Sequence, residues 1–151
     1  MYRVLIVDDC EPWRRTLRST IEANGRWVLV AEAADGASAV EQARALRPDL
    51  TVLDVTLPSL NGIEAAQRIL AENPTSRILF LSEHRSWEIV DAAMATGARG
   101  YVVKADAARE LLPAMEAVVS GGIFRSRSVR TIAPSRGIPR PRVPKPPFEE
   151  T

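Results

Sequence analysis

The sequence predicts an α/β domain in which helices cover both faces of a doubly wound, five-stranded parallel sheet. Short apolar runs alternate with longer stretches of helical periodicity from residue 1 to about residue 122. The short runs are apolar at nearly every position, which is typical of parallel strands buried on both faces. Asparagine, glycine or proline follows most of the helical stretches, as expected at helix ends.

Each expected element follows from these patterns. The first strand is the run at 4–7, and the helix after it has Trp13, Leu17 and Ile21 on one face. Asp106 has the position of an N-cap for the last helix. The strands are expected at 4–7, 27–31, 50–53, 78–81 and 101–103, and the helices at 13–23, 38–46, 63–72, 87–96 and 106–119.

The last part of the chain has a different composition. Residues 1–124 contain 13 basic and 17 acidic residues, whereas residues 125–151 contain 7 basic and 2 acidic ones. Six of the 11 prolines lie between Pro134 and Pro147. Such a segment buries too little apolar surface to offset its chain entropy. We therefore predict a domain at 1–122, followed by an extended or disordered tail at 123–151.

Cysteine content and hydropathy limit the class of protein. Cys10 is the single cysteine, so no disulfide forms within the chain, and a reducing compartment suits it. The first apolar run is too short for a signal peptide. No stretch reaches the roughly 20 apolar residues that span a bilayer. The sequence therefore predicts a cytoplasmic protein without a membrane partner.

Polar residues follow four of the five expected strands directly. Asp8 and Asp9 come after the first strand and Asp54 after the third, while Ser82 and Lys104 follow the fourth and the fifth. In an open parallel sheet, ligands bind at the carboxyl ends of the strands, near the point where the strand order reverses. We expect these side chains to meet at that edge.

Three carboxylates in one cleft repel one another. At a separation of roughly 4 Å and an effective dielectric constant of about 20, one pair costs about 4 kcal/mol. Lys104 supplies one positive charge, and Mg²⁺ suits the remainder because it prefers a few carboxylates, water and phosphate oxygens. A carboxylate beside Mg²⁺ can attack a phosphoryl group. The pattern indicates phosphoryl transfer to Asp54.

Four segments of the chain form a signature when they are taken in order. They are VLIVDDCEPWRRTL, LTVLDVTLPSLNGIEA, RILFLSEH and GARGYVVKADA. Together they resemble the receiver domain of bacterial two-component response regulators, over about residues 1–122. The resemblance implies a CheY-like, flavodoxin-like sheet with strand order 2-1-3-4-5. It implies site roles as follows: Asp54 accepts the phosphoryl group, Asp8, Asp9, Asp54 and the Thr56 carbonyl hold Mg²⁺, Lys104 pairs with the phosphate, and Ser82 and Tyr101 form the switch.

The segment KADAARELLPAMEAVVSGG is similar to the last helix of receivers of the NarL/FixJ class, which usually carry a DNA-binding helix-turn-helix afterwards. The prolines of the tail exclude such a pair of helices. The resemblance implies a sensor histidine kinase as partner and a phosphoacceptor that is not a turnover enzyme. It does not imply direct DNA binding by this chain. The helix at 87–96 with the following strand and last helix is a candidate homodimer surface, and an ordinary packed helix explains it equally well.

Other interpretations remain at this point. Each site residue alone has a plain alternative, such as a turn aspartate, a solvated lysine or a core tyrosine. A haloacid dehalogenase type of phosphatase needs a second aspartate where this chain has Thr56. A phosphorylation-independent interaction module and a DNA-binding regulator that acts through the basic tail are the further alternatives. His84, the single histidine, is either a surface loop residue or a group that tunes hydrolysis of the phosphorylated site.

Overall fold

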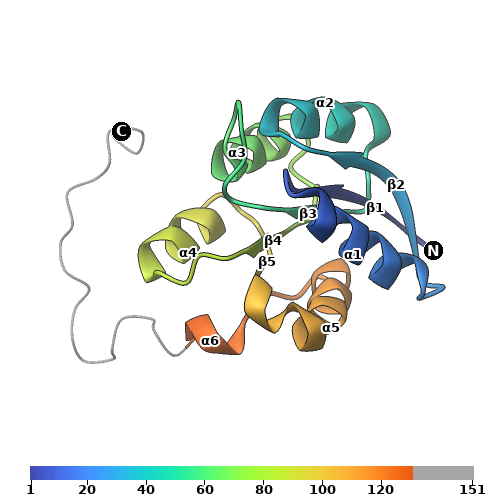
Figure 1. The fold of residues 1–151 in the computed structure, drawn as a ribbon. Helices are drawn as coiled ribbons and strands as arrows, with labels where there is room; N and C mark the ends of the chain where they lie inside the picture. Colours follow the sequence, from blue (N-terminus) through green and yellow to red (C-terminus); the bar gives the residue numbers. More distant parts are fainter. Residues whose placement is uncertain (131–151) are drawn as a thin grey trace.

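The computed structural model describes residues 1–130, which form a parallel six-stranded sheet in the order β2-β1-β3-β4-β5-β6 (Figure 1). Every neighbouring pair of strands is parallel. The strands are β1 (Tyr2–Val7), β2 (Trp27–Ala33), β3 (Leu50–Leu53), β4 (Ile78–Ser82), β5 (Gly100–Val103) and β6 (Phe124–Arg125). The helices are α1 (Glu11–Glu22), α2 (Gly36–Leu46), α3 (Gly62–Glu72), α4 (Trp87–Met94), a 3-10 turn η1 (Lys104–Asp106), α5 (Ala107–Val119) and α6 (Arg127–Arg130).

The predicted fold class and the order 2-1-3-4-5 are confirmed, but the number of strands was wrong. The sheet has a sixth strand, β6, which pairs with β5, and the short helix α6 follows it. Two residues are too few to produce a periodic pattern, so this strand has no recognisable signal in the sequence. Residues 124–130 of the predicted tail therefore pack onto the sheet, whereas 131–151 lie outside the described residues.

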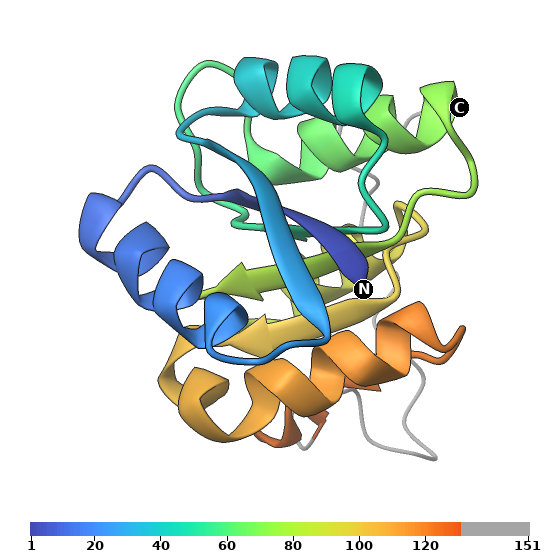
Figure 2. The ribbon, with the colours of Figure 1, turned by 90° about the vertical axis from the view of Figure 1, so that its right-hand side faces the viewer.

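Two apolar clusters hold the helices against opposite faces of the sheet. One face packs against α2, α3 and α4, and the other packs against α1 and α5. Figure 2 shows α2 and α3 above the sheet, α5 below it and α1 at its left. The strands β3, β4 and β5 are buried along their whole length, as their unbroken apolar runs predict. The edge strand β2 is only partly buried.

The register of the strands aligns the residues of interest at one edge. Val7 pairs with Leu53, so the residues that follow them, Asp8 and Asp54, are side by side. Ser82 pairs with Val103, the residue before Lys104. The parallel sheet thus positions the carboxyl ends of β1, β3, β4 and β5 next to one another.

The loop between β3 and α3 is held close beneath the acidic edge. The Gly62 amide donates to the Val55 carbonyl at 2.7 Å, and a Cβ atom on Gly62 would lie only 1.8 Å from the Asp54 carbonyl oxygen. Glycine is therefore required here by the close approach of two backbone segments. The requirement ties the start of α3 to the position of Asp54.

We predict that Gly62→Ala destabilises the domain by about 3 kcal/mol, because the new methyl group forces the loop away from Asp54. Urea unfolding of the variant measures this loss. Gly25→Ala is the matched control, since a Cβ atom there meets nothing within 4 Å. The explanation is wrong if the two substitutions have equal effects.

Candidate functional site

Three carboxylates meet at the carboxyl edge of the sheet. Asp8, Asp9 and Asp54 each offer an oxygen atom, and these atoms lie within 4.8 Å of one another. Asp8 and Asp54 are 1% and 7% exposed, whereas Asp9 is exposed. The cluster is therefore buried on the side of the sheet and open to solvent at Asp9.

Lys104 balances the two buried carboxylates. Its Nζ lies 2.7 Å from Asp8 Oδ2 and 3.1 Å from Asp54 Oδ2, and the residue is only 8% exposed. The same ammonium lies 4.9 Å from the ring centroid of Trp13, at the start of α1. A cation over an aromatic face is favourable, so Trp13 supports the charge that the carboxylates require.

Burial and charge act in opposite directions on these groups. Burial raises the pKa of Asp54, and it outweighs the opposing attraction of Lys104. Burial alone would lower the pKa of Lys104, but the hydrogen bond to Asp8 and the charge of Asp54 together raise it. Lys104 is therefore held as a cation, and the Asp54 carboxylate is more basic than one in water.

Asp8 also shapes the loop that follows β1. Its Oδ1 accepts the Cys10 amide at 2.8 Å, and its carbonyl accepts the Arg14 guanidinium at 2.6 Å. Cys10 is the N-cap of α1 without a side-chain hydrogen bond, so neither aspartate caps this helix.

Ser82, His84 and Tyr101 are linked in the loop after β4. Ser82 is fully buried, and its Oγ accepts the His84 amide at 3.1 Å. The Tyr101 hydroxyl donates to the His84 carbonyl at 2.9 Å. Burial raises the pKa of Tyr101 to about 12, so its phenol remains a neutral donor. The hydroxyl groups of Ser82 and Tyr101 thus both hold the backbone of one residue.

The His84 ring extends across the site to the loop after β3. Its Nε2 lies 2.8 Å from Oγ1 of Thr56, two residues beyond Asp54. The contact joins the β3–α3 loop to the β4–α4 loop, with Thr56 exposed and His84 partly buried. Sequence spacing could not reveal this pair, because the two residues come from different loops.

The structure brings together four of the residues that the sequence singled out: Asp8, Asp9, Asp54 and Lys104. Ser82, Thr56 and Tyr101 lie in the adjoining strands and loops, but the Tyr101 hydroxyl is bonded to His84 rather than to a carboxylate. Sequence reasoning missed the role of Trp13. Its place on the apolar face of the first helix gave no sign that its ring meets Lys104.

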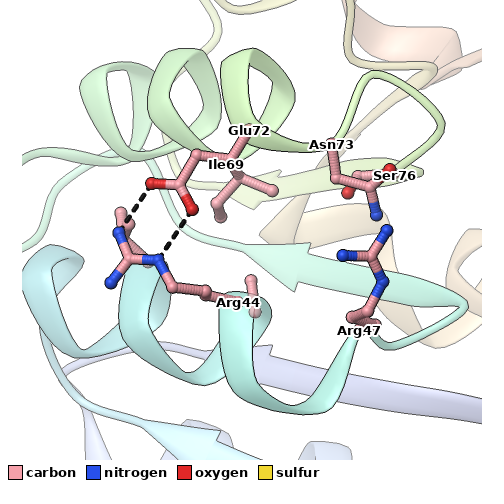
Figure 3. A pocket seen from close by; sticks show the side chains of 8 residues that line it. Arg44, Arg47, Ile69, Glu72, Asn73 and Ser76 are labelled. Atoms are coloured by element: carbon pink, nitrogen blue, oxygen red, sulfur yellow. Dashed lines mark hydrogen bonds and ion pairs between the residues drawn. The ribbon is translucent and has the colours of Figure 1, made fainter.

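A second hollow lies between α2 and α3, at the opposite end of β3 (Figure 3). Arg44 reaches across it and forms two hydrogen bonds with Glu72, at 2.7 and 2.6 Å. Figure 3 shows the Arg47 side chain near Asn73 and Ser76. The Arg44–Glu72 pair is neutralised within the hollow, which has no carboxylate cluster comparable with the one around Asp54.

The fold and the site together define a class of protein: an α/β domain with three carboxylates and one lysine at the carboxyl edge of a parallel sheet. Comparison with known proteins identifies the family. The family model for the response regulator receiver domain matches residues 4–116. The chain therefore belongs to the response regulator receiver family, whose members act in two-component signalling. Within residues 1–130, no helix is long and apolar enough to cross a membrane.

Individual relatives agree with this assignment. The chain is 35% identical over 119 residues to Protein CcdB of Bacillus subtilis, covering 79% of this chain and 98% of that protein. It is 40% identical to the DNA-binding transcriptional activator DevR/DosR of Mycobacterium tuberculosis, covering 80% of this chain but 56% of that protein. The crystal structure of a LuxR-family response regulator from Aurantimonas superposes with a TM-score of 0.84 at 35% identity, covering 87% of this chain and 94% of that one.

We predict that Lys104→Met lowers the free energy of unfolding by about 3 kcal/mol in the presence of a chelator, because Asp8 and Asp54 lose their shared counter-charge. Adding Asp54→Asn to this variant should restore about 1.5 kcal/mol by removing one of the two carboxylates. Urea unfolding of the double-mutant cycle measures both changes. Arg109→Met, at an exposed ion pair, is the control and should change stability by less than about 0.5 kcal/mol. Full stability of Lys104→Met would contradict this charge balance.

Proposed function

We propose that this chain accepts a phosphoryl group on Asp54 from a sensor histidine kinase and thereby changes its α4–β5–α5 surface. The observation that carries the proposal is the buried pair of carboxylates, Asp8 and Asp54, bridged by one ammonium and opened to solvent at Asp9. An acidic cluster with an internal cation suits phosphoryl transfer, in which a protein acts mainly by positioning the reacting groups and neutralising the charge of the transferred phosphoryl group.

Asp54 is the proposed nucleophile. Its carboxylate oxygen would form a bond to phosphorus while the bond from phosphorus to the donor breaks, and the electron pair leaves with the donor. Burial raises the pKa of this carboxyl group, which favours attack by its oxygen. Lys104 would then move its contact from the carboxylate to a phosphoryl oxygen. The hydroxyl of Ser82, on the neighbouring strand, is the proposed second contact.

The acidic residues fit Mg²⁺. All three donors are carboxylate oxygens within 4.8 Å of one another, and the exposed Asp9 leaves room for water ligands. Asp8, Asp9 and Asp54 would hold the ion together with the Thr56 carbonyl. When bound, Mg²⁺ supplies positive charge for the oxygens of the transferred group.

The proposed role is that of a signalling module rather than a turnover enzyme, since the acceptor is the chain itself. A cytoplasmic site of action and a homodimer through the α4–β5–α5 surface are parts of the same proposal. Direct DNA binding by this chain is not part of it. The rival is a receiver-like module that acts by contact alone, without phosphorylation.

We expect incubation with Mg²⁺ and acetyl phosphate to add the mass of one phosphoryl group, because the ammonium of Lys104, 3.1 Å from the Asp54 carboxylate, can neutralise charge on the incoming group. Intact mass spectrometry measures the gain. Asp54→Asn should abolish it. Asp49→Asn is the matched control at the opposite end of β3, where the Asp49 carboxylate accepts the Arg3 amide at 2.8 Å. Absence of any gain, with Mg²⁺ also failing to bind, would favour the contact-only rival.

We also expect His84→Ala to change the lifetime of phosphorylated Asp54. The ring of His84 and the side chain of Thr56 meet at 2.8 Å, two residues along the chain from Asp54, and the proposed role of this pair is to screen the phosphorylated carboxylate from water. Decay of the phosphorylated mass over time measures the lifetime. Thr56→Val removes the other half of the contact and should change the lifetime in the same direction. An unaltered decay rate in both variants would leave His84 as an ordinary loop residue.

A further inference from the structure

The segment after the last long helix is bound to the part of the receiver that carries Lys104. Residues 124–130, here called the docked segment, contain β6 and α6. The Ser126 amide donates to the Tyr101 carbonyl at 2.8 Å, and the Phe124 amide donates to the Arg99 carbonyl at 2.9 Å. The segment thus extends the sheet beyond β5, so that β5 is not an edge strand.

Two serine hydroxyls attach this segment on either side of Lys104. Ser126 is fully buried, and its Oγ accepts the amide of Val103, the residue before Lys104, at 2.8 Å. The Ser128 hydroxyl donates to Oδ2 of Asp106, two residues after Lys104, at 2.7 Å. The short 3-10 turn that carries Lys104 is therefore held at both ends by residues of the docked segment.

The surface beneath the segment is acidic, and the segment is basic. Glu110 on α5 accepts both the Ser126 hydroxyl and the Arg127 amide, the latter at 3.1 Å. Asp91 on α4 lies 3.8 Å from Arg125. The chemistry of the two partners is complementary, which argues for a specific intramolecular interface rather than a chance contact.

Apolar side chains anchor the docked segment to both faces of the sheet. Val129 is 1% exposed and packs in the cluster of α2, α3 and α4, whereas Phe124 packs against the cluster of α1 and α5. Ile123, just before the segment, is 66% exposed. Burial thus begins with the residues that pair with β5.

We propose that residues 124–130 are the intramolecular partner of the α4–β5–α5 surface and that phosphorylation of Asp54 loosens their docking. Lys104 Nζ lies 3.1 Å from the Asp54 carboxylate, so a phosphoryl group added to Asp54 would displace the ammonium from this contact. In the proposed coupling the 3-10 turn shifts with Lys104, and the bonds of Ser126 to Val103 and of Ser128 to Asp106 are the ones that this shift weakens. The inference rests on the proposed function, because it needs Asp54 to be phosphorylated.

Coupling of this kind is reciprocal. If phosphorylation weakens the docking, then weakened docking must favour the phosphorylated form by the same factor. The docked segment would in this way connect the chemical state of Asp54 to whatever lies beyond residue 130. It would also cover the α4–β5–α5 surface until phosphorylation frees that surface.

Residue-resolved hydrogen exchange on the full chain tests the proposal, with and without Mg²⁺ and acetyl phosphate. The amides of Ser126 and Val103 should exchange about fivefold faster, or more, in the phosphorylated chain. The Asp49 amide, which donates to the Arg3 carbonyl at the far end of the sheet, is the internal control and should not change.

Two variants test whether weaker docking of the segment favours phosphorylation of Asp54. Ser128→Ala and Ser126→Ala should speed exchange at these amides without phosphorylation, and should raise the phosphorylated fraction at limiting acetyl phosphate. Ser128 is the milder site, because loss of the Ser126 hydroxyl leaves the Val103 amide without its partner. Ser120→Ala, at an exposed serine after α5, is the control.

The outcomes separate this inference from the proposed function. A phosphoryl mass gain with unchanged or slower exchange at Ser126 and Val103 overturns the coupling and leaves phosphorylation standing. No mass gain at all overturns both. Faster exchange together with a raised phosphorylated fraction in Ser128→Ala supports the coupling.

Discussion

The placement of one ammonium between two buried carboxylates is the constraint on which the rest of this structure depends. Asp8 and Asp54 come from neighbouring parallel strands, and the sheet forces them together whether or not their charges agree. Unpaired, they would repel strongly in a site so poorly exposed to water. Lys104 must therefore stay close, and the turn that carries it must be held in place.

Several neighbouring features serve that requirement. Trp13 covers the ammonium from the side of α1, and Asp8 fixes the loop that leads into this helix. Gly62 lets the β3–α3 loop pass against the Asp54 backbone. On the far side, Ser126 and Ser128 hold the residues that flank Lys104. Lys104 is thus held in two ways. The carboxylates bind its ammonium, and the docked segment holds the 3-10 turn that carries it.

Short hydrogen bonds connect the strands and loops beside Asp54 with the surface of the protein. Ser82 and Tyr101 both bond the backbone of His84, whose ring contacts Thr56. The backbone of Tyr101 in turn accepts the Ser126 amide. The polar groups beside Asp54 are therefore linked to one another, so that a shift in one of these bonds bears on its neighbours.

The sequence by itself determined the sheet, the order of its elements and the residues at its carboxyl edge, because these depend on local periodicity and on which residue follows each strand. It indicated Asp8, Asp9, Asp54 and Lys104 for that reason, and the structure brings them together. Only the tertiary structure decided which partners they have. The side chain of Asp106 accepts a hydrogen bond from Ser128 of the docked segment and makes no N-cap hydrogen bond to α5. The strand β6 joins the sheet although its two residues are too few to form a recognisable sequence pattern. The contacts of Trp13 with Lys104 and of Thr56 with His84 likewise arise between segments distant in the chain, where packing rather than local pattern sets the geometry.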